Sequence, residues 1–205
     1  MKYDLKIYLY PLLLLILLGT TPVDSESMTV DRDSSEIRQL LEQRDREIKE
    51  LLGPEGTDYT QQQRDKLKDI INGIIDYRAM ARYALQRTWD TLSTDQRDNF
   101  VDLFSTIVRD QSMNKLDIYR ADVVYKEIEV NGDSARVNTT VTIDRVRTPV
   151  IYQMVYENSP GTWMVHDMVI DDVSTAASYR RQFQNIIRKK GYQHLVDVLK
   201  KRASR

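Results

Sequence analysis

The sequence TWMVHDMVIDDVSTAASYRRQF, residues 162–183, contains the change of periodicity that decides the fold. Its first half alternates apolar and polar side chains, which is typical of a strand with one packed face. The acidic pair Asp171-Asp172 then interrupts the strand, and either Ser174 or Thr175 is a suitable N-cap for a helix. The apolar residues that follow recur with a helical period. We therefore expect a strand that leads through an acidic turn into an amphipathic helix lying over a sheet.

Four helices are predicted before the sheet, because apolar residues recur there at helical spacing. Each begins at a residue suited to the N-cap position, namely Asp33, Thr60, Asp76 and Ser93. Three of these caps are followed, three residues later, by Glu or Gln, which is the capping-box pattern. We expect the helix after Asp76 to be continuous as far as the next tryptophan, and the helix after Ser93 to end near Tyr119.

The periodicity changes from helical to alternating after Asp122, which predicts strands. Before the strand that contains Trp163, strands are expected over 123–130, 134–143 and 150–156. The Asn131-Gly132 pair is a strong hairpin signal between the first two of these. Pro149 suits the start of the third, because proline lacks the N–H group that a sheet interior requires.

These elements predict an α+β fold, in which four antiparallel strands form a curved sheet with helices on one face. After the sheet we expect two helices separated at Gly191. The chain has 205 residues, enough for one domain with a substantial core. We expect that domain to span residues 33–200.

The N-terminus predicts export from the cytoplasm. Lys2 and Lys6 precede an apolar block at 7–18, which is shorter than the roughly 20 residues of a spanning helix. A basic start followed by a short apolar block is typical of a secretory signal peptide. We expect residues 1–25 to be that peptide, or else an uncleaved anchor.

The composition argues against several classes of function. The formal net charge is −1, so the overall charge gives no reason to expect nucleic-acid binding. The chain has no cysteine, which excludes disulfides, thiol nucleophiles and cysteine metal sites. Its two histidines, His166 and His194, are not part of any catalytic or metal-binding pattern, and no phosphate-binding loop occurs. We therefore expect no catalytic residue, no metal and no cofactor.

The predicted sheet has more apolar surface than a single core requires, since two of its strands carry apolar residues on both faces. Either protein covers both faces, or part of the inner surface lines a cavity for an apolar ligand. The candidate lining residues from helices and strands are Ile71, Ile74, Ile75, Met80, Tyr83, Phe104, Ile107, Val108, Val141, Ile143, Val150, Tyr152, Met154, Trp163 and Val165.

Two groups of residues resemble signatures of the MlaC (toluene-tolerance) family. The first is DYRAMAR at 76–82, followed by Ala84-Leu85, Trp89, Gln96-Arg97 and the run FVDLF at 100–104. The second is WMVHDM at 163–168, followed by Val173-Ser174, Tyr179-Arg180, Gln182-Phe183 and Gly191. The resemblance covers about residues 63–199. The chain departs from the family pattern at Gln86 and Asp172, where the family usually has glycine, and at Ser112, where it often has an aromatic residue.

The resemblance implies an NTF2-like curved sheet combined with a helical subdomain, in a periplasmic protein that holds the acyl tails of a phospholipid. It also implies exchange of lipid with an outer-membrane lipoprotein complex and with an inner-membrane ABC transporter through its MCE-domain protein. We expect a monomer. Three alternatives stay open, namely a carrier of hopanoids or other rigid lipids, an NTF2-like enzyme acting on an apolar substrate, and a structural adaptor with a filled core.

Overall fold

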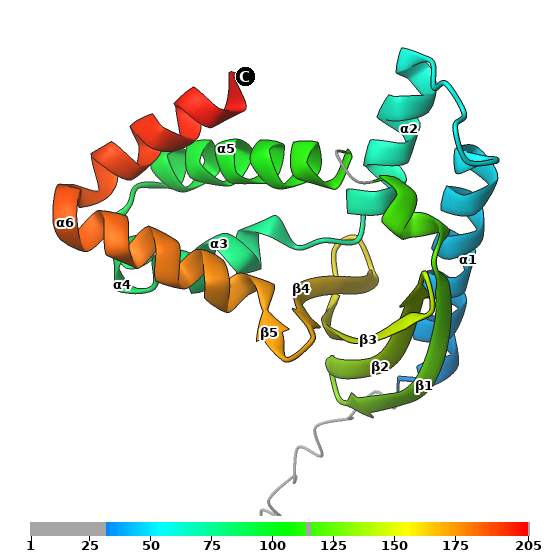
Figure 1. Ribbon diagram of the computed structural model, residues 1–205. Helices are drawn as coiled ribbons and strands as arrows, with labels where there is room; N and C mark the ends of the chain where they lie inside the picture. The colour runs from blue at the N-terminus through cyan, green and yellow to red at the C-terminus, as the bar shows by residue number, and fades with distance from the viewer. Residues whose placement is uncertain (1–31, 114–115, 205) are drawn as a thin grey trace, which may run out of the picture.

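The computed structural model describes residues 32–113 and 116–204 (Figure 1). The predicted signal segment, residues 1–25, lies outside them. The helices and strands are α1 (Ser34–Leu52), α2 (Gln61–Asn72), α3 (Tyr77–Leu85), α4 (Arg87–Thr91), α5 (Thr94–Met113), the 3-10 helix η1 (Leu116–Arg120), β1 (Asp122–Asn131), β2 (Ser134–Ile143), β3 (Val146–Glu157), β4 (Thr162–Ile170), β5 (Val173–Ser174) and α6 (Thr175–Ala203). Within the described residues, no helix is long and apolar enough to cross a membrane.

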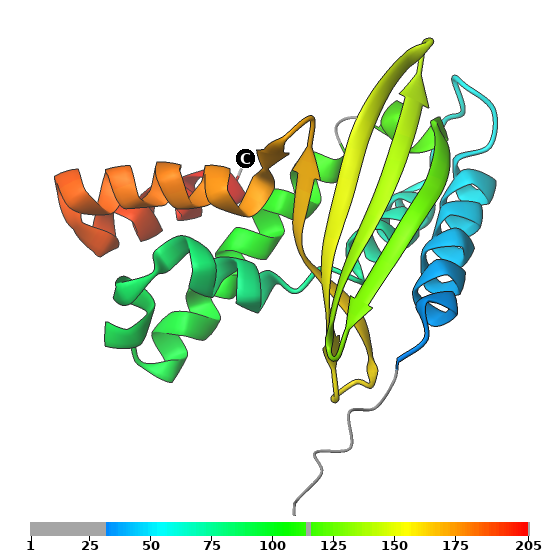
Figure 2. The same cartoon turned by 90° about the horizontal axis from the view of Figure 1, so that it is seen from below.

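The strands form one antiparallel sheet in chain order, β1-β2-β3-β4-β5. Figure 2 shows that the sheet is curved, that α1 lies along one of its faces, and that a layer of helices projects from the side of β4 and β5. This layer consists of α3, α4, α5 and α6. The predicted α+β fold with a curved antiparallel sheet and a helical subdomain is therefore confirmed.

Separate apolar clusters hold these layers together. The helical cluster lies between α3, α4, α5 and α6, where Phe183 meets Phe100 and Phe104 edge to face at 5.7 and 5.6 Å between ring centroids. The sheet cluster joins Ile37 and Leu41 of α1 to the strands. A third cluster joins the C-terminal part of α1 to α2 and η1.

The strand-to-helix unit that decides the fold forms as expected. Ser174 is the N-cap of α6, and its hydroxyl accepts from the N–H of Ala177 at 2.9 Å. The buried carboxylate of Asp167 on β4 accepts from the N–H of Ala176 at 2.9 Å and from the Ser174 hydroxyl at 2.6 Å. These bonds satisfy N–H groups that the helix itself leaves free, and they fix α6 to the sheet.

The C-terminal helix is interrupted at Gly191, as predicted. Its backbone there is not helical, with φ 83° and ψ 167°. Figure 1 shows the two halves of α6 running in opposite directions, the orange half away from the sheet and the red half back toward it. This reversal lets Phe183, Leu195 and Leu199 pack on one side, against α3 and α5.

The predicted helix starts are correct, with one difference in detail. Thr60 and Gln63 form a full capping box, and Ser93 bonds reciprocally with Gln96. Asp33 also caps its helix, but its carboxylate accepts from the N–H of Ser35 and forms no reciprocal bond with Glu36.

Two predicted helices have different limits in the structure. The helix predicted to run unbroken from Asp76 is divided at Gln86, where φ is 50° and ψ is −131°. This conformation ends α3 because it cannot continue the i to i+4 hydrogen-bond ladder. The helix predicted to reach Tyr119 ends at Met113, and Tyr119 lies in η1.

The hairpins also differ from the prediction in register. Asn131 pairs with Ser134, so the first turn consists of Gly132 and Asp133 rather than the Asn-Gly pair. The third strand begins at Val146 instead of Pro149. Proline is tolerated there because the β3–β4 ladder begins at Val150, and on that side Pro149 contributes only its carbonyl, which accepts from the N–H of Asp171.

Candidate functional site

The face of the sheet that meets α1, called here the inner face, is mostly apolar and carries no charged side chain in its paired rows. On β2 it carries Ala135, Val137, Thr139, Val141 and Ile143, because alternate residues share a face. The strand register places residues of β1, β3, β4 and β5 beside them on the same face. These residues are Val123, Tyr125, Ile128, Val130, Val146, Thr148, Val150, Tyr152, Met154, Val165, Met168, Ile170 and Val173.

Coverage of the inner face changes along the strands. Under α1 it is closed, and Val137 and Val165 are 0% and 2% exposed. Toward the β2–β3 and β4–β5 turns the coverage ends, and Ile143 and Ile170 are 39% and 44% exposed. The buried apolar surface therefore continues into solvent-exposed apolar surface, without a charged side chain between them in these rows.

Four branched aliphatic residues form this exposed end, which we call the apolar rim. They are Ile143, Val146, Ile170 and Val173, and their exposure ranges from 39% to 64%. The rim consists of two adjacent hairpin ends, since the N–H of Asp171 donates to the carbonyl of Pro149 at 3.0 Å. Large aliphatic groups grouped at a surface in this way indicate contact with another apolar molecule.

Both hairpin ends of the rim have a two-residue turn with positive φ at each position. The values are 49° and 69° at Asp144 and Arg145, and 48° and 60° at Asp171 and Asp172. Such turns match the twist of the strands and keep the flanking apolar side chains in register. The acidic pair thus forms a turn, while Ser174 and the preceding strand supply the helix cap.

Tyrosine side chains lie on the inner face between its closed and open ends. Burial raises the pKa of Tyr152 to about 12, with a smaller effect of the nearby Asp45 carboxylate and of Tyr119 in η1. Burial likewise raises the pKa of Tyr125 and of Tyr119. All three rings are nevertheless only half-buried. These partly exposed rings lie where the covered part of the inner face passes into its accessible part.

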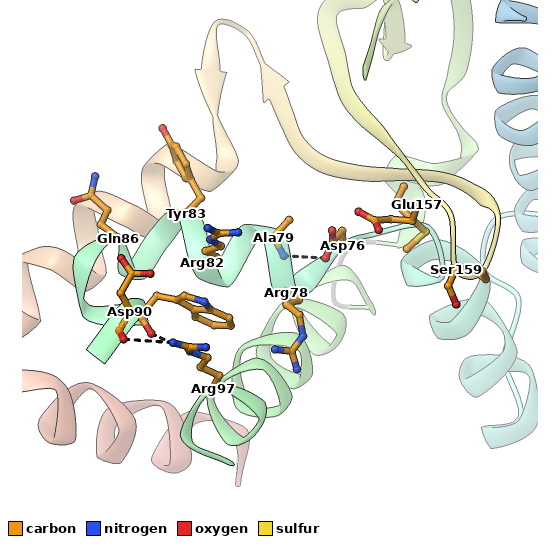
Figure 3. A pocket seen from close by; sticks show the side chains of 13 residues that line it. Asp76, Arg78, Ala79, Arg82, Tyr83, Gln86, Asp90, Arg97, Glu157 and Ser159 are labelled. Carbon is orange, nitrogen blue, oxygen red and sulfur yellow. Dashed lines mark hydrogen bonds between the residues drawn. The ribbon is translucent and has the colours of Figure 1, made fainter. Parts of the chain in front are cut away.

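A separate groove lies on the other side of the sheet, between the β3–β4 hairpin and α3, α4 and α5. Its volume is about 930 Å³. Figure 3 shows arginine, carboxylate and amide side chains gathered around it. It is lined by Asp76, Arg78, Ala79, Arg82, Tyr83, Gln86, Trp89, Asp90, Arg97, Glu157, Ser159, Pro160 and Met164. Its polar lining distinguishes it from the inner face.

The structure separates the predicted lining residues into groups. Those on or packed against the inner face are Ile74, Val141, Ile143, Val150, Tyr152, Met154, Trp163 and Val165. Those that pack in the helical cluster are Ile75, Met80, Phe104, Ile107 and Val108. Ile71 belongs to the third cluster. Tyr83 is 45% exposed and lines the polar groove instead.

Several inner-face residues were not predicted from the sequence. Tyr125 is on the alternating face of β1, so the period-2 pattern contained its signal. Ile170 and Val173 flank the acidic turn and could have been recognised once that turn was taken as a hairpin. Tyr119 could not, because it enters the site through η1, which lies outside the regular pattern.

Comparison with known protein families assigns this chain to a family. The model of the MlaC protein family matches residues 32–201, which is nearly all of the described chain. This chain belongs to the MlaC family. The match includes the inner face, the apolar rim and the polar groove, so all three are features of its MlaC domain. No curated protein matches the sequence at a significant level.

A solved structure shares the fold of this MlaC-family chain. It is a phospholipid-binding protein from Ralstonia solanacearum, determined in complex with a phospholipid. The TM-score is 0.68 at 22% sequence identity, and the alignment covers 83% of this chain and 96% of that protein. The similarity extends through both the sheet and the helical layer, and at this identity it establishes the fold.

Proposed function

We propose that this protein binds phospholipid on the inner face of its sheet and carries it between membranes, without catalysing a reaction. The acyl tails lie between the sheet, α1 and η1. The headgroup lies at the apolar rim, in contact with water. Family membership and the phospholipid-bound relative in the same fold support this assignment.

One observation carries the proposal, namely the largely apolar surface, without charged side chains, that runs from the closed end of the inner face to the exposed rim. Burial of hydrocarbon contributes about 0.8 kcal/mol per CH₂ group, so two acyl tails in water are strongly unfavourable. Transfer from a bilayer to an apolar protein surface replaces one apolar environment by another, and its net free energy is small. A continuous apolar path is what such a transfer requires.

Membership of the MlaC family also supports a place for the protein in a lipid-transport system. We propose that it works in the periplasm as a monomer. A signal peptide at residues 1–25 directs its export and is then cleaved. In the periplasm the protein exchanges lipid with an outer-membrane lipoprotein complex and with the MCE-domain protein of an inner-membrane ABC transporter, and so helps to maintain lipid asymmetry. Because the exchange energy is small, the direction of transport comes from these partners.

A lipid extract tests this proposal directly. The protein is exported from a bacterial host, purified, extracted with organic solvent and analysed by mass spectrometry. We expect phospholipid at about one molecule per chain. A polycyclic lipid such as a hopanoid in its place would support the alternative function, a carrier of rigid lipids. The absence of any stoichiometric lipid would contradict both carrier functions.

Two variants distinguish ligand contact from core packing in the same experiment. Val141→Asp and Tyr152→Asp place a carboxylate on the half-buried middle of the inner face. We expect both to lose the bound lipid more than they lose helical content, because a charge opposite hydrocarbon is not hydrated. Unfolding without a specific loss of lipid would identify these side chains as ordinary core.

A further inference from the structure

The C-terminal helix carries a concentration of positive charge that lipid binding on the inner face does not use. α6 contains eight of the 30 Lys and Arg residues of the chain and only one of its 31 Asp and Glu residues. Its first half, residues 175–190, has no acidic residue. The basic residues of this half, called here the basic patch, are Arg180, Arg181, Arg188, Lys189 and Lys190. Because the whole chain has a formal net charge of −1, the patch is a local feature.

The basic patch faces water because the opposite side of the helix is packed. Phe183 is buried in the helical cluster, whereas Arg181 and Arg188 are exposed. The guanidinium of Arg181 donates to the Ser178 hydroxyl at 2.9 Å, and that of Arg188 donates to the side-chain oxygen of Asn185 at 3.3 Å. These four residues therefore form one polar stripe along about 15 Å of the helix.

None of the five cations of the basic patch forms an ion pair with a carboxylate in the described part of the chain. The guanidinium of Arg180 lies 4.9 Å from the centroid of the Tyr83 ring, and hydroxyl and amide partners leave the charges of the others unchanged. The helix macrodipole favours cations near the C-terminal end of a helix. It does not account for Arg180 and Arg181, which lie in the second turn of α6.

The basic patch starts close to the apolar rim. Val173 of the rim is two residues before α6, and the turn before it holds Asp171 and Asp172, the nearest acidic residues along the chain. From there the first half of α6 runs away from the sheet, and its end at the reversal is the part of the helix farthest from the sheet (Figure 1). A rise of about 1.5 Å per residue puts Lys189 about 21 Å from the start of the helix. The cations thus extend outward from the rim.

The composition of the patch suits a charged surface better than a folded partner. Stable protein interfaces depend on apolar or aromatic side chains buried at their centre. Along the described length of α6 no large apolar side chain is exposed, and the neighbouring Tyr83 ring, 45% exposed, is partly covered by Arg180. Flexible cations spread along a helix are attracted by charge alone to a layer of negative lipid headgroups.

We propose that the basic patch docks the protein on the anionic headgroups of a membrane. Headgroup phosphates lie against Arg181, Arg188 and Lys189 on the exposed side of α6. Because α6 begins two residues after Val173, this contact keeps the apolar rim beside the bilayer that supplies the acyl tails. The purpose of the docking rests on the proposed function, whereas the contact itself requires only the charges of the patch.

Co-sedimentation with vesicles tests the docking. The exported protein is mixed at low salt with vesicles of phosphatidylcholine alone, or with vesicles in which about one-third of the lipid is phosphatidylglycerol. The test variant combines Arg181→Glu, Arg188→Glu and Lys189→Glu, all at exposed positions of α6.

A control variant makes the same change of charge elsewhere. It combines Lys66→Glu, Lys126→Glu and Arg136→Glu, at exposed positions of α2, β1 and β2. Circular dichroism and thermal unfolding of both variants check that the fold is kept. The natural protein is also measured at high salt, a comparison that does not depend on the folding of any variant.

We expect the natural protein to sediment with the anionic vesicles and not with the neutral ones. The test variant should bind about 100-fold more weakly, as three lost cations at an anionic surface imply. The control variant should stay within about threefold of the natural protein, because its charges lie beyond the screening length from the docked surface. Binding of the natural protein should be largely lost at 1 M salt (roughly a 3 Å screening length).

Equal binding by the test and control variants would overturn the proposal, and so would vesicle binding that 1 M salt (roughly a 3 Å screening length) leaves unchanged. Binding to soluble polyglutamate without binding to anionic vesicles would overturn it in favour of an acidic protein partner. A protein that yields phospholipid on extraction but ignores anionic vesicles would overturn the docking alone. Salt-sensitive vesicle binding by a protein without bound lipid would support the docking and contradict the carrier function.

Discussion

Gln86 is a residue in a backbone conformation that suits glycine. At φ 50° and ψ −131° its Cβ is crowded by the backbone, and the position joins α3 to α4 through bonds from Gln86 N to Arg82 O and from Trp89 N to Gln86 O. The chain keeps the break between α3 and α4 although it lacks glycine, the residue that adopts this conformation without steric strain. Some stability is therefore lost at this residue.

Replacing this side chain should recover that stability. Gln86→Gly removes the strained Cβ, worth about 1–2 kcal/mol, but adds backbone entropy to the unfolded chain, so we expect a net gain of about 0.5–1 kcal/mol. Thermal unfolding should shift upward by about 1–4 °C. Gln86→Ala is the control, because it removes the same polar group and keeps the Cβ. An equal shift in both variants would contradict the explanation.

Tyr152 makes stability depend on pH in the alkaline range. Its pKa is raised to about 12 in the folded protein by burial, so the folded state holds the phenol proton more tightly than the unfolded chain does. The stabilising effect is complete below pH ~10 and is lost as the pH rises toward 12. Tyr152→Phe should flatten this decline by up to about 1.4 kcal/mol per pH unit. Urea unfolding at several alkaline pH values measures the two slopes, and identical slopes would show that the phenol is not buried.

At the scale of elements, the reversal within α6 depends on Gly191. A backbone at φ 83° and ψ 167° is almost restricted to glycine, and no atom lies within 4 Å of the position that a Cβ would take. Gly191→Ala should therefore destabilise the protein by about 1–3 kcal/mol through backbone strain alone. Chemical denaturation measures the loss, and Lys190→Ala at the exposed neighbouring position should be nearly neutral. A neutral Gly191→Ala would mean that the two halves of α6 tolerate another connection.

Elements were predictable where their signals are local. Thr60 with Gln63, and the alternation after Asp122, describe contacts within a few residues, so the helix starts and the sheet could be derived from the sequence. The break at Gln86 could not, because nothing in that side chain favours positive φ. The start of β3 before Pro149 depends on how far β4 extends beside it, which is a property of the whole sheet.

At the scale of the whole molecule, the site depends on where covering elements end. The sequence predicted which side chains are apolar, and Val141, Ile143 and Tyr152 do share the inner face. It could not show that α1 stops short of the β2–β3 and β4–β5 turns, because that depends on how a helix sits on a curved sheet. For the same reason the sequence could not show that Phe104, predicted to line the cavity, packs among helices instead.

The apolar rim connects this architecture to lipid exchange, and two exposed positions test the connection. Ile170 is 44% exposed at the rim, and Val124 is 56% exposed on the opposite face of the sheet. Because both side chains already face water, Ile170→Asp and Val124→Asp should change stability little. Only Ile170→Asp puts a charge on the path of the acyl tails, and a cost of about 1.4 kcal/mol there weakens binding tenfold. Uptake of fluorescent phospholipid from vesicles should therefore fall about tenfold for Ile170→Asp and stay unchanged for Val124→Asp. Equal uptake by both variants would mean that lipid enters the protein somewhere other than the rim.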